Sequence, residues 1–383
     1  MGALDGMLVV SLEQAVAAPY ATRLLAEAGA RVIKIERAEG DFARGYDRAA
    51  KGLSSYFVWL NHGKDSVVLD LKAEADRALL ERILGHADVF VQNLAPGAAD
   101  RLGLGQAALE QRFPRLVTCS ISGFGDEGPY ATRKGYDLVV QAETGLAAVT
   151  GSPDAPGRVG ISICDISTGL AAYAAILEAL LARGRNGRGE ALRLSLFDTI
   201  AEWMTAPYLH ARYGQGAPAR VGLAHPSIAP YGTYPTRGAP ILLAIQNGRE
   251  WQRFCDIVMD DAAFAADPRF ASNVSRTENR GALDALIGVR FVGLERDALV
   301  ALLERADLVF GTVNEVADFL AHPQLRQQVV ETEAGEIAMP ASAVKRSGAS
   351  VPARRRVPAI GEDGARIRAE FAEIVRDRIE QDT

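Results

Sequence analysis

One carboxylate in this sequence stands out as a candidate for chemistry. Asp165 lies in the stretch Gly160 to Gly169 (GISICDISTG), where a short extended run is expected to turn into a long apolar helix over Leu170 to Arg183. An aspartate is ionised at neutral pH, so it can attack a reactive acyl group such as a thioester without help from a base, with N–H groups of the helix start nearby for the oxyanion. Aspartate is also a favoured helix N-cap, and its charge suits the positive end of a helix. The local sequence therefore leaves two interpretations of Asp165 open, a nucleophile and a cap.

Other catalytic residue types lack the spacing that their chemistry requires. The five histidines show no H-x-x-x-H spacing, and the three cysteines are widely separated, so we expect neither a metal site nor a disulfide framework. The G-x-S-x-G turn of serine hydrolases is absent from the sequence. Cys164 could be a nucleophile, although a small residue in an apolar run is more typical of a protein core.

Four cations are placed where a sheet could gather them around a ligand. Arg37, Lys72 and Arg101 lie at or just past the carboxyl ends of expected strands, and Lys134 is expected to open the helix after the next strand. In open parallel α/β sheets, ligands bind outside these strand ends. The pattern indicates a phosphorylated ligand, and ordinary surface charges are the alternative interpretation.

The elements that would position these residues alternate between strand and helix. Helical periodicity predicts one helix over Pro19 to Ala28 and another over Ala73 to His86. Strands separated by helices of this length indicate parallel βαβ units, so the expected fold class is α/β with a Rossmann-like parallel sheet. The expected strands are Met7 to Leu12, Arg31 to Glu36, Ser66 to Leu71, Asp88 to Gln92, Leu116 to Ser122 and Ala191 to Leu196.

A nicotinamide cofactor is not expected on this sheet. Its fingerprint would be G-x-G-x-x-G directly after the first strand. The turn from Glu13 to Pro19 contains no glycine, which argues against NAD and against a dehydrogenase.

The chain is expected to divide into three parts. Residues 214–240 are rich in Gly, Pro and Ala, which indicates a crossing between domains. We therefore predict a large Rossmann-like domain over residues 1–213, a linker and small α+β domain over 214–325, and a C-terminal segment over 326–383 that returns to the large domain.

Composition restricts the possible partners of the protein. A net charge of −6 over 383 residues argues against general nucleic-acid binding. Residues 1–30 lack a basic leader followed by an apolar run, and the most apolar helix, which carries Glu178, is expected to be too short to span a bilayer. We expect no membrane partner and a cytoplasmic location.

Segments along nearly the whole chain resemble the family III CoA-transferases, the group that includes formyl-CoA transferase, carnitine CoA-transferase and α-methylacyl-CoA racemase. The matching segments are Leu4-Asp5-Gly6, AAPYATRLLAEAGARVIKIER ending at Arg37, VVLDLK ending at Lys72, QNLAPGAADRLG around Asn93, GYDLVVQAETG from Gly135, the stretch around Asp165, and HPSIAPYG from His225.

The resemblance implies a role for each matching position. Asp165 corresponds to the family's catalytic aspartate, which forms acyl-anhydride and aspartyl-CoA thioester intermediates. Family members are interlocked homodimers, act on an acyl-CoA and a small carboxylic acid, and use CoA as a substrate without a metal. The positions that correspond to CoA-binding residues are Ala15, Val16, Arg37, Leu69, Lys72, Asn93, Leu94, Arg101 and Lys134.

Two departures from the family pattern bear on the reaction. Val16 replaces a glutamine that formyl-CoA transferase uses, which argues against an oxalate and formate pair. Tyr136 replaces the histidine base of the racemase G-H-D motif, which argues against proton abstraction.

The resemblance predicts a CoA-transferase that draws CoA from an acyl-CoA, with succinyl-CoA as one candidate donor. A racemase-like enzyme and a non-catalytic acyl-CoA-binding protein are the alternatives. The sequence names neither acid, and it leaves the role of the loop from His225 to Tyr231 open.

Overall fold

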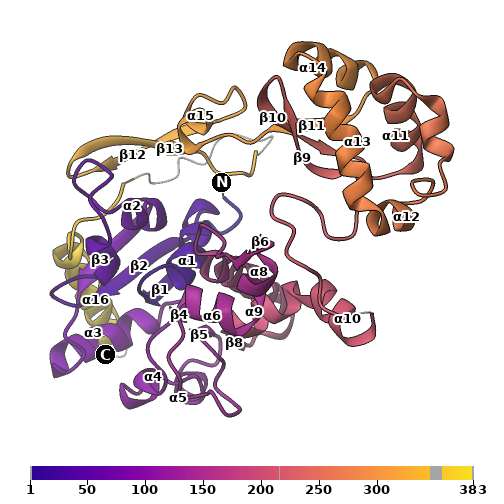
Figure 1. Ribbon diagram of the computed structural model, residues 1–383. Coiled ribbons are helices and arrows are strands. Elements are labelled where there is room, and N and C mark those ends of the chain that lie inside the picture. The colour runs from indigo at the N-terminus through magenta and orange to yellow at the C-terminus, as the bar shows by residue number, and fades with distance from the viewer. Residues whose placement is uncertain (1, 215, 346–355, 382–383) are drawn as a thin grey trace. The chain divides into compact units, whose positions relative to one another are not determined.

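The computed structural model describes residues 2–214, 216–345 and 356–381, which form two compact units (Figure 1). The first unit lies within residues 1–146, 159–206 and 326–383, and the second lies within residues 147–158 and 207–325. The division into domains at residues 213/214 and 325/326 stays a prediction.

A six-stranded parallel sheet forms the centre of the first unit. The strands lie in the order β3-β2-β1-β4-β5-β8, and every neighbouring pair is parallel. The order reverses between β1 and β4, as in doubly wound folds, and it confirms the predicted Rossmann-like α/β class. The strands are β1 (Leu8–Leu12), β2 (Arg31–Glu36), β3 (Lys64–Val68), β4 (Val89–Gln92), β5 (Val117–Ser122) and β8 (Ala191–Ser195).

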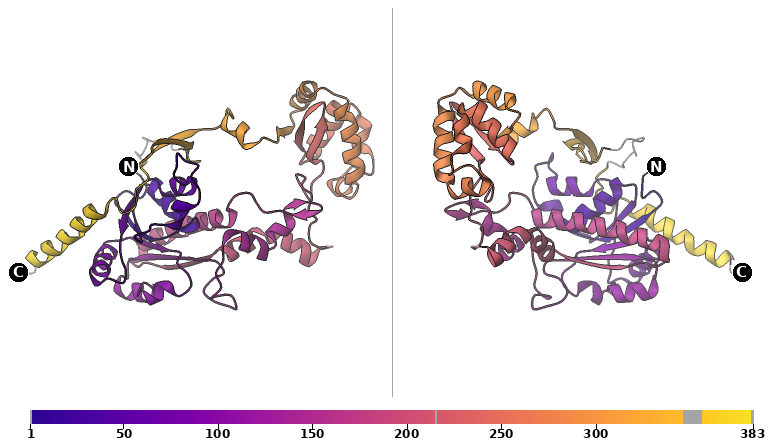
Figure 2. Two further views of the ribbon diagram at one scale, coloured as in Figure 1. Left: turned by 60° about the vertical axis from the view of Figure 1, so that its left-hand side comes forward. Right: turned by 90° about the vertical axis from the view of Figure 1, so that its right-hand side faces the viewer.

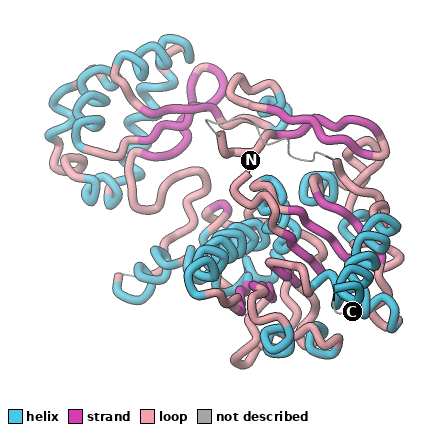
Figure 3. Tube along the Cα trace, turned by 180° about the vertical axis from the view of Figure 1, so that it is seen from behind, coloured by secondary structure: helices cyan, strands magenta, loops and turns pink. Residues whose placement is uncertain are grey.

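Helices cover both faces of this sheet, which Figure 3 shows from behind. Neighbouring strand residues point to opposite faces, so Val9 packs in the cluster that contains α1 and α8, whereas Val10 packs in the cluster that contains α3 and α16. The four covering helices are α1 (Ala17–Glu27), α8 (Ile163–Asn186), α3 (Glu74–Leu84) and α16 (Gly364–Gln381). The shorter helices between them are α2 (Ser55–Asn61), α4 (Ala98–Arg101), α5 (Gln106–Arg112), α6 (Asp137–Glu143) and α9 (Leu196–Trp203). Helix α7 (Leu146–Val149) begins at the last residue of this stretch of the first unit and continues in the second.

Helix α8 begins earlier and is longer than the sequence predicts. It spans 24 residues from Ile163 and runs beside the sheet (Figure 2), so Asp165 lies inside its first turn and not before it. The expectation that this helix is too short to cross a membrane is wrong, because its length and composition suffice. Core helices pass the same test, and one face of α8, with Ala172 and Ile176, is buried in the cluster that also contains α1.

The second unit contains a three-stranded antiparallel sheet packed with helices, which is the expected α+β arrangement. Its core is rich in aromatic side chains, including Trp251, Phe254 and Phe291. The elements are α10 (Thr205–Tyr213), β9 (Tyr231–Thr236), β10 (Gly238–Ala244), α11 (Gly248–Arg253), α12 (Asn273–Glu278), α13 (Arg280–Val292), α14 (Arg296–Arg305), β11 (Val309–Thr312) and α15 (Val316–Leu320).

The chain then returns to the first unit through a hairpin of β12 (Gln327–Thr332) and β13 (Gly335–Pro340). Helix α16 attaches to the sheet by ion pairs. Arg31 on β2 donates two hydrogen bonds to Glu370, at 2.6 and 2.9 Å, and a third to Asp65 at 2.9 Å. The predicted return segment also includes residues 346–355, which lie outside the described residues.

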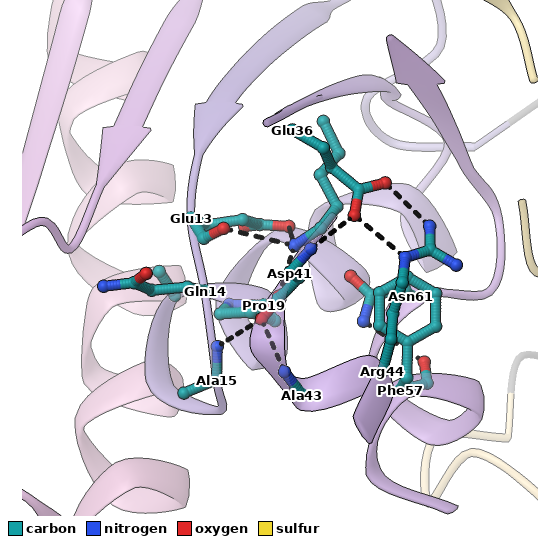
Figure 4. Close-up of polar contacts among 12 residues, drawn as sticks. Glu13, Gln14, Ala15, Pro19, Glu36, Asp41, Ala43, Arg44, Phe57 and Asn61 are labelled. Carbon is teal, nitrogen blue, oxygen red and sulfur yellow. Dashed lines mark hydrogen bonds and ion pairs between the residues drawn. The ribbon is translucent and has the colours of Figure 1, made fainter. Parts of the chain in front are cut away.

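Buried charges connect the loops at the carboxyl ends of the first strands (Figure 4). Lys34 on β2 donates to the Asp41 carboxylate at 2.9 Å, and Lys64 on β3 donates to the Glu13 carboxylate at 2.7 Å; all four side chains are fully buried or nearly so. Burial acts to raise the pKa of Glu13, but the charges of Lys64 and Lys34 outweigh it and lower that pKa. Thr22 on α1 also donates to Glu13, at 2.6 Å.

Glu36 at the end of β2 extends the same network. Its carboxylate accepts two hydrogen bonds from Arg44, at 2.9 and 2.7 Å, and one from the Asp41 N–H at 2.9 Å. The Arg44 guanidinium lies 3.7 Å from the centre of the Phe57 ring and donates to the Pro358 carbonyl. The loops after β1 and β2 are therefore held to each other by buried side chains and to the returning chain by the partly exposed Arg44.

Replacing Lys34 by methionine should destabilise the protein strongly. The change would leave the buried Asp41 carboxylate without its cation, and removing one partner of a buried ion pair costs about 3–5 kcal/mol. Urea unfolding would measure this loss. The control is Lys345→Met at an exposed lysine, where we expect a change within about 0.5 kcal/mol. A similar small effect at Lys34 would show that the network does not stabilise the fold.

Candidate functional site

The reversal of strand order places the β1 and β4 loops side by side. Asn93, directly after β4, accepts a hydrogen bond from the Gln14 N–H at 2.9 Å and donates one to the Gln14 carbonyl at 2.8 Å. Ligands of open α/β sheets bind in the crevice at this reversal. Asn93 thus joins the two loops that border the crevice.

A hollow of about 540 Å³ lies over the carboxyl ends of β1, β2 and β3. Four of the residues predicted to bind CoA line it: Arg37, Leu69, Lys72 and Leu94. Arg37 and Lys72 are exposed, whereas Leu69 is buried in the floor. The lining thus combines apolar surface and two cations with the acidic residues Glu13, Glu36, Glu39, Asp41 and Asp70.

A second hollow of about 780 Å³ lies on the other side of Leu94, which borders both. Arg101 and Lys134 line this second hollow. Lys134 does not open a helix as predicted, because α6 begins three residues later at Asp137 and Lys134 lies in the preceding loop. The predicted cations are thus divided between two adjoining hollows, two in each.

Arg193 also lines the second hollow, and it is not among the residues that the sequence predicts for the site. It lies on the edge strand β8 between Leu192 and Leu194 and forms an ion pair with Asp126 at 3.1 Å. The alternation of apolar and charged residues could have indicated that this arginine faces away from its neighbours.

Ala15, Val16 and Asn93 are not in the lining of either hollow, although they belong to the loops around them. Ala15 adopts a left-handed backbone with φ of 62°, and its N–H donates to Asp41 at 3.2 Å. Val16 is buried and is the residue before α1. The buried charges therefore determine the backbone conformation of this turn. Ala15 and Val16 would thus contribute main-chain groups to CoA binding, and not side chains.

Asp165 is not the N-cap of α8. Ser162 occupies that position, and Asp165 is the third residue of the helix. The side chain that caps the helix is Asp137, the first residue of α6, which accepts the Cys164 N–H at 2.7 Å and the Asp165 N–H at 3.4 Å. Among the residues that the structure describes, the Asp165 carboxylate accepts no hydrogen bond and forms no ion pair, so the interpretation of Asp165 as a cap is wrong.

The surroundings of Asp165 favour its neutral form. Burial, and then repulsion by the Asp137 carboxylate, raises the pKa of Asp165 from its ordinary value of 3.8 to about 7. A carboxylate in the first turn of a helix is normally stabilised by free N–H groups. Here Asp137 occupies those groups, so the usual stabilisation is absent.

Helix α1 lies against α8 one turn beyond Asp165. A Cβ atom at Gly169 would lie 2.5 Å from the carbonyl oxygen of Ala17, so only glycine allows this approach. Residues four apart lie on the same face of a helix, which directs Asp165 towards the side of α8 that faces the start of α1. No side chain caps the N-terminus of α1.

Aromatic side chains extend from α1 to the neighbourhood of Asp165. Ring centres lie 5.7 Å apart for Tyr20 and Trp59, 6.4 Å for Trp59 and Tyr56, and 5.6 Å for Tyr56 and Tyr46. Burial, and then the charges of Asp41 and Asp165, raises the pKa of Tyr46 to about 12. The sequence pattern does not reveal this group, since its members come from three separate segments.

Cys164, the alternative nucleophile, is fully buried. Burial and the adjacent Asp137 carboxylate raise the pKa of its thiol, which disfavours the reactive thiolate. No group of three or more His, Cys, Asp or Glu side chains that could hold a metal ion occurs among the described residues.

The loop from His225 to Tyr231 belongs to the second unit and is held from within it. Arg280 donates to the carbonyls of His225 and Ile228, both at 2.6 Å, and the His225 ring stacks on Tyr231 with centres 5.4 Å apart. These contacts define the conformation of the loop, and its role stays open.

Comparisons with known proteins agree on one family. Residues 4–364 match the sequence pattern of CoA-transferase family III. The chain is 36% identical to acetyl-CoA:oxalate CoA-transferase of Acetobacter aceti, covering 97% of this chain and 96% of that protein. It is 32% identical to succinate–glutarate CoA-transferase of Agrobacterium fabrum (strain C58 / ATCC 33970), with the same coverage. A CAIB/BAIF family protein from Brucella suis superposes with a TM-score of 0.82 at 35% identity, over 97% of this chain and 99% of that one.

Asp165→Asn should stabilise the fold more at alkaline than at acidic pH. Between the unfolded pKa of 3.8 and the folded value of about 7, the folded chain keeps a proton that the unfolded chain has released. Stability therefore falls as pH rises through this range and stays lower above it. Asparagine carries no such penalty, so its gain in melting temperature should be larger at about pH 8 than at about pH 5.

Scanning fluorimetry at the two pH values measures this difference. Asp154→Asn, at an exposed aspartate, is the control and should show no such dependence on pH. Equal gains for Asp165→Asn at both values would contradict the raised pKa.

Proposed function

The chain belongs to CoA-transferase family III, and we propose that Asp165 is the nucleophile through which this CoA-transferase moves CoA from an acyl-CoA to a carboxylic acid. The observation that supports this role is the state of the Asp165 carboxylate: it is half-buried, has no hydrogen-bond partner among the described residues, and leaves the capping of its own helix to Asp137. A cap would be bound to main-chain N–H groups, whereas a nucleophile must be free to approach a carbonyl carbon.

The proposed reaction has four steps that balance without a redox cofactor. An Asp165 oxygen attacks the thioester carbon, the C–S bond breaks, and CoA leaves as a thiolate, which gives a mixed anhydride. The thiolate then attacks the aspartyl carbonyl, which releases the donor acid and leaves Asp165 as a CoA thioester. The acceptor carboxylate attacks this thioester and again forms an anhydride and a thiolate. Attack of the thiolate on the acceptor acyl carbon regenerates Asp165, so neither a metal nor NAD is needed.

Each attack places negative charge on a carbonyl oxygen, which N–H donors would stabilise. The start of α8 cannot provide them, because Asp137 accepts its N–H groups. The expectation that those groups serve the oxyanion is therefore wrong. The uncapped start of α1, after Val16, is the better source, since the Gly169 contact brings α1 against the face of α8 that carries Asp165.

CoA is a substrate of this enzyme, and we propose that it lies across the two adjoining hollows. Each hollow supplies two of the predicted cations, and CoA carries its phosphates in two separate groups. The acids are proposed by analogy with relatives whose names include oxalate, succinate and glutarate, so a short dicarboxylic acid is the expected substrate.

We further propose the interlocked homodimer that the resemblance predicts. Helices α6, α8 and α9 of the first unit expose apolar side chains that a partner could cover: Leu138, Val139, Leu170, Leu181 and Trp203. Sedimentation velocity at micromolar concentration tests this state, and a stable monomer would exclude it. The cytoplasmic location, and the absence of nucleic-acid and membrane partners, stay predictions.

Asp165→Asn should abolish transfer while CoA binding is retained. The amide cannot form the anhydride, and asparagine has nearly the same size as aspartate. The assay uses succinyl-CoA or acetyl-CoA as donor and oxalate or glutarate as acceptor. Wild-type enzyme incubated with a donor and then with hydroxylamine should carry a modification on the peptide that contains Asp165. Substantial turnover by the variant would exclude Asp165 as nucleophile.

Arg101→Ala should weaken CoA binding roughly tenfold or more, because charge-assisted contacts to phosphate contribute about 1.5–3 kcal/mol each. Isothermal titration with CoA measures the loss. Arg188→Ala removes an exposed arginine that lines neither hollow and is the matched control. Equal affinity in both variants would place the phosphates elsewhere.

A further inference from the structure

Two carboxylates meet at the start of α8, and they have opposite environments. Asp137 is buried and accepts the Cys164 N–H at 2.7 Å, while its second oxygen accepts the Gln141 side-chain amide at 2.7 Å. Gln141, also buried, accepts the Val159 N–H at 2.9 Å. Asp165, one residue past Cys164, has none of these partners. The pair formed by Asp137 and Gln141 thus connects α6 to the first turn of α8 and to the segment that leads into it.

The groups that face Asp165 include no cation that pairs with it among the described residues. Asp137 approaches it from α6, Cys164 precedes it on its own helix, and Tyr46 approaches from the loop after β2. Asp137 is the one charged group in this set besides Asp165. All of the hydrogen bonds of the Asp137 side chain have it as acceptor, which is the behaviour of a carboxylate.

This arrangement reverses the usual effect of a helix start on an acid. Free N–H groups would stabilise the Asp165 charge and weaken it as a nucleophile. With those groups bound to Asp137, the site disfavours the charged carboxylate. When Asp165 attacks a thioester, a C–O bond forms, the C–S bond breaks, and the negative charge moves from Asp165 to the CoA sulfur. An environment that disfavours charge on Asp165 therefore favours its acylated forms.

We propose that Asp137 is a positioning residue for the transfer reaction: by capping α8 with its own carboxylate, it orients Asp165 and makes the uncharged, covalently modified state of Asp165 the favoured one. This inference depends on the proposed role of Asp165 as nucleophile. It assigns to Asp137 a function that acts through Asp165 and requires no contact with substrate.

Asp137→Asn and Asp137→Ser separate the charge of Asp137 from its capping. Asparagine has the shape of aspartate and keeps an oxygen that can accept the Cys164 N–H, whereas the shorter serine removes the charge and also withdraws its oxygen from that N–H. In the pH profile of kcat/KM, the fall in activity on the acidic side should move about one pH unit lower than in the wild type. The plateau of kcat should also fall, because Asp165 becomes a weaker base. The fraction of enzyme trapped by hydroxylamine at Asp165 should decrease in parallel.

The control is Asp198→Asn, at an acid in the first turn of the neighbouring helix α9 that does not face Asp165. This variant should keep the wild-type pH profile. Circular dichroism and the melting temperature identify which Asp137 variants are folded, and either folded variant suffices for the test.

If Asp137 is purely a structural cap, its replacement should lower kcat equally at every pH and leave the acidic limb of the profile in place. That result would overturn the proposal. If Asp165→Asn is inactive while the Asp137 variants keep the wild-type limb, the proposal for Asp137 fails and the function of Asp165 stands. Turnover by Asp165→Asn would instead overturn both the proposed role of Asp165 and the proposed role of Asp137.

Discussion

The first unit depends on one constraint, that charged side chains buried beneath the strand ends must all be paired. Taking a charge out of water costs several kcal/mol, which an opposite charge and hydrogen bonds must offset. Lys34 and Lys64 satisfy this requirement with Glu13 and Asp41, and they do so from adjacent strands. Because Asp41 also accepts the Ala15 N–H, the same interactions define the turn that leads into α1. The loops of the site are therefore fixed by a network whose acids Glu13, Glu36 and Asp41 also line the first hollow.

The candidate nucleophile is governed by a related rule applied at a helix end. The first turn of α8 has N–H groups that need an acceptor, and two aspartates are available. Asp137, which arrives from α6, takes them, and Asp165 is left without a partner among the described residues. Burial without a partner is unfavourable for a carboxylate, and it raises the pKa of Asp165 to about 7. Such a shift is typical of residues that act in chemistry, because a structural carboxylate would have acquired a donor. Asp165 lines neither of the two hollows, so its link to the ligand rests on its position beside α1.

The position of α1 connects these two features. Its N-terminus follows the turn that Asp41 holds, and its contact with Gly169 brings it against the face of α8 that carries Asp165. The buried charges therefore influence the surroundings of Asp165 indirectly, because they fix the backbone that leads into α1. A substitution at Lys34 or Lys64, which line neither hollow, can therefore alter the site, and the close approach at Gly169 leaves little room for the two helices to adjust.

The sequence alone determined the local features of this protein. Apolar runs and helical spacing predicted five of the six strands of the large sheet to within a residue, although β3 begins two residues earlier than expected, and they predicted the α/β class. Because the strands were expected to be parallel, the sequence also predicted that residues following them, such as Arg37, lie at the same edge of the sheet. Only the tertiary structure decided which aspartate caps α8, since Asp137 and the Cys164 N–H are 27 residues apart and periodicity carries no information about such a contact. The same reason explains why α8 begins at Ile163. The alternation in β8 shows which face Arg193 lies on, but only the tertiary structure places that face in the second hollow.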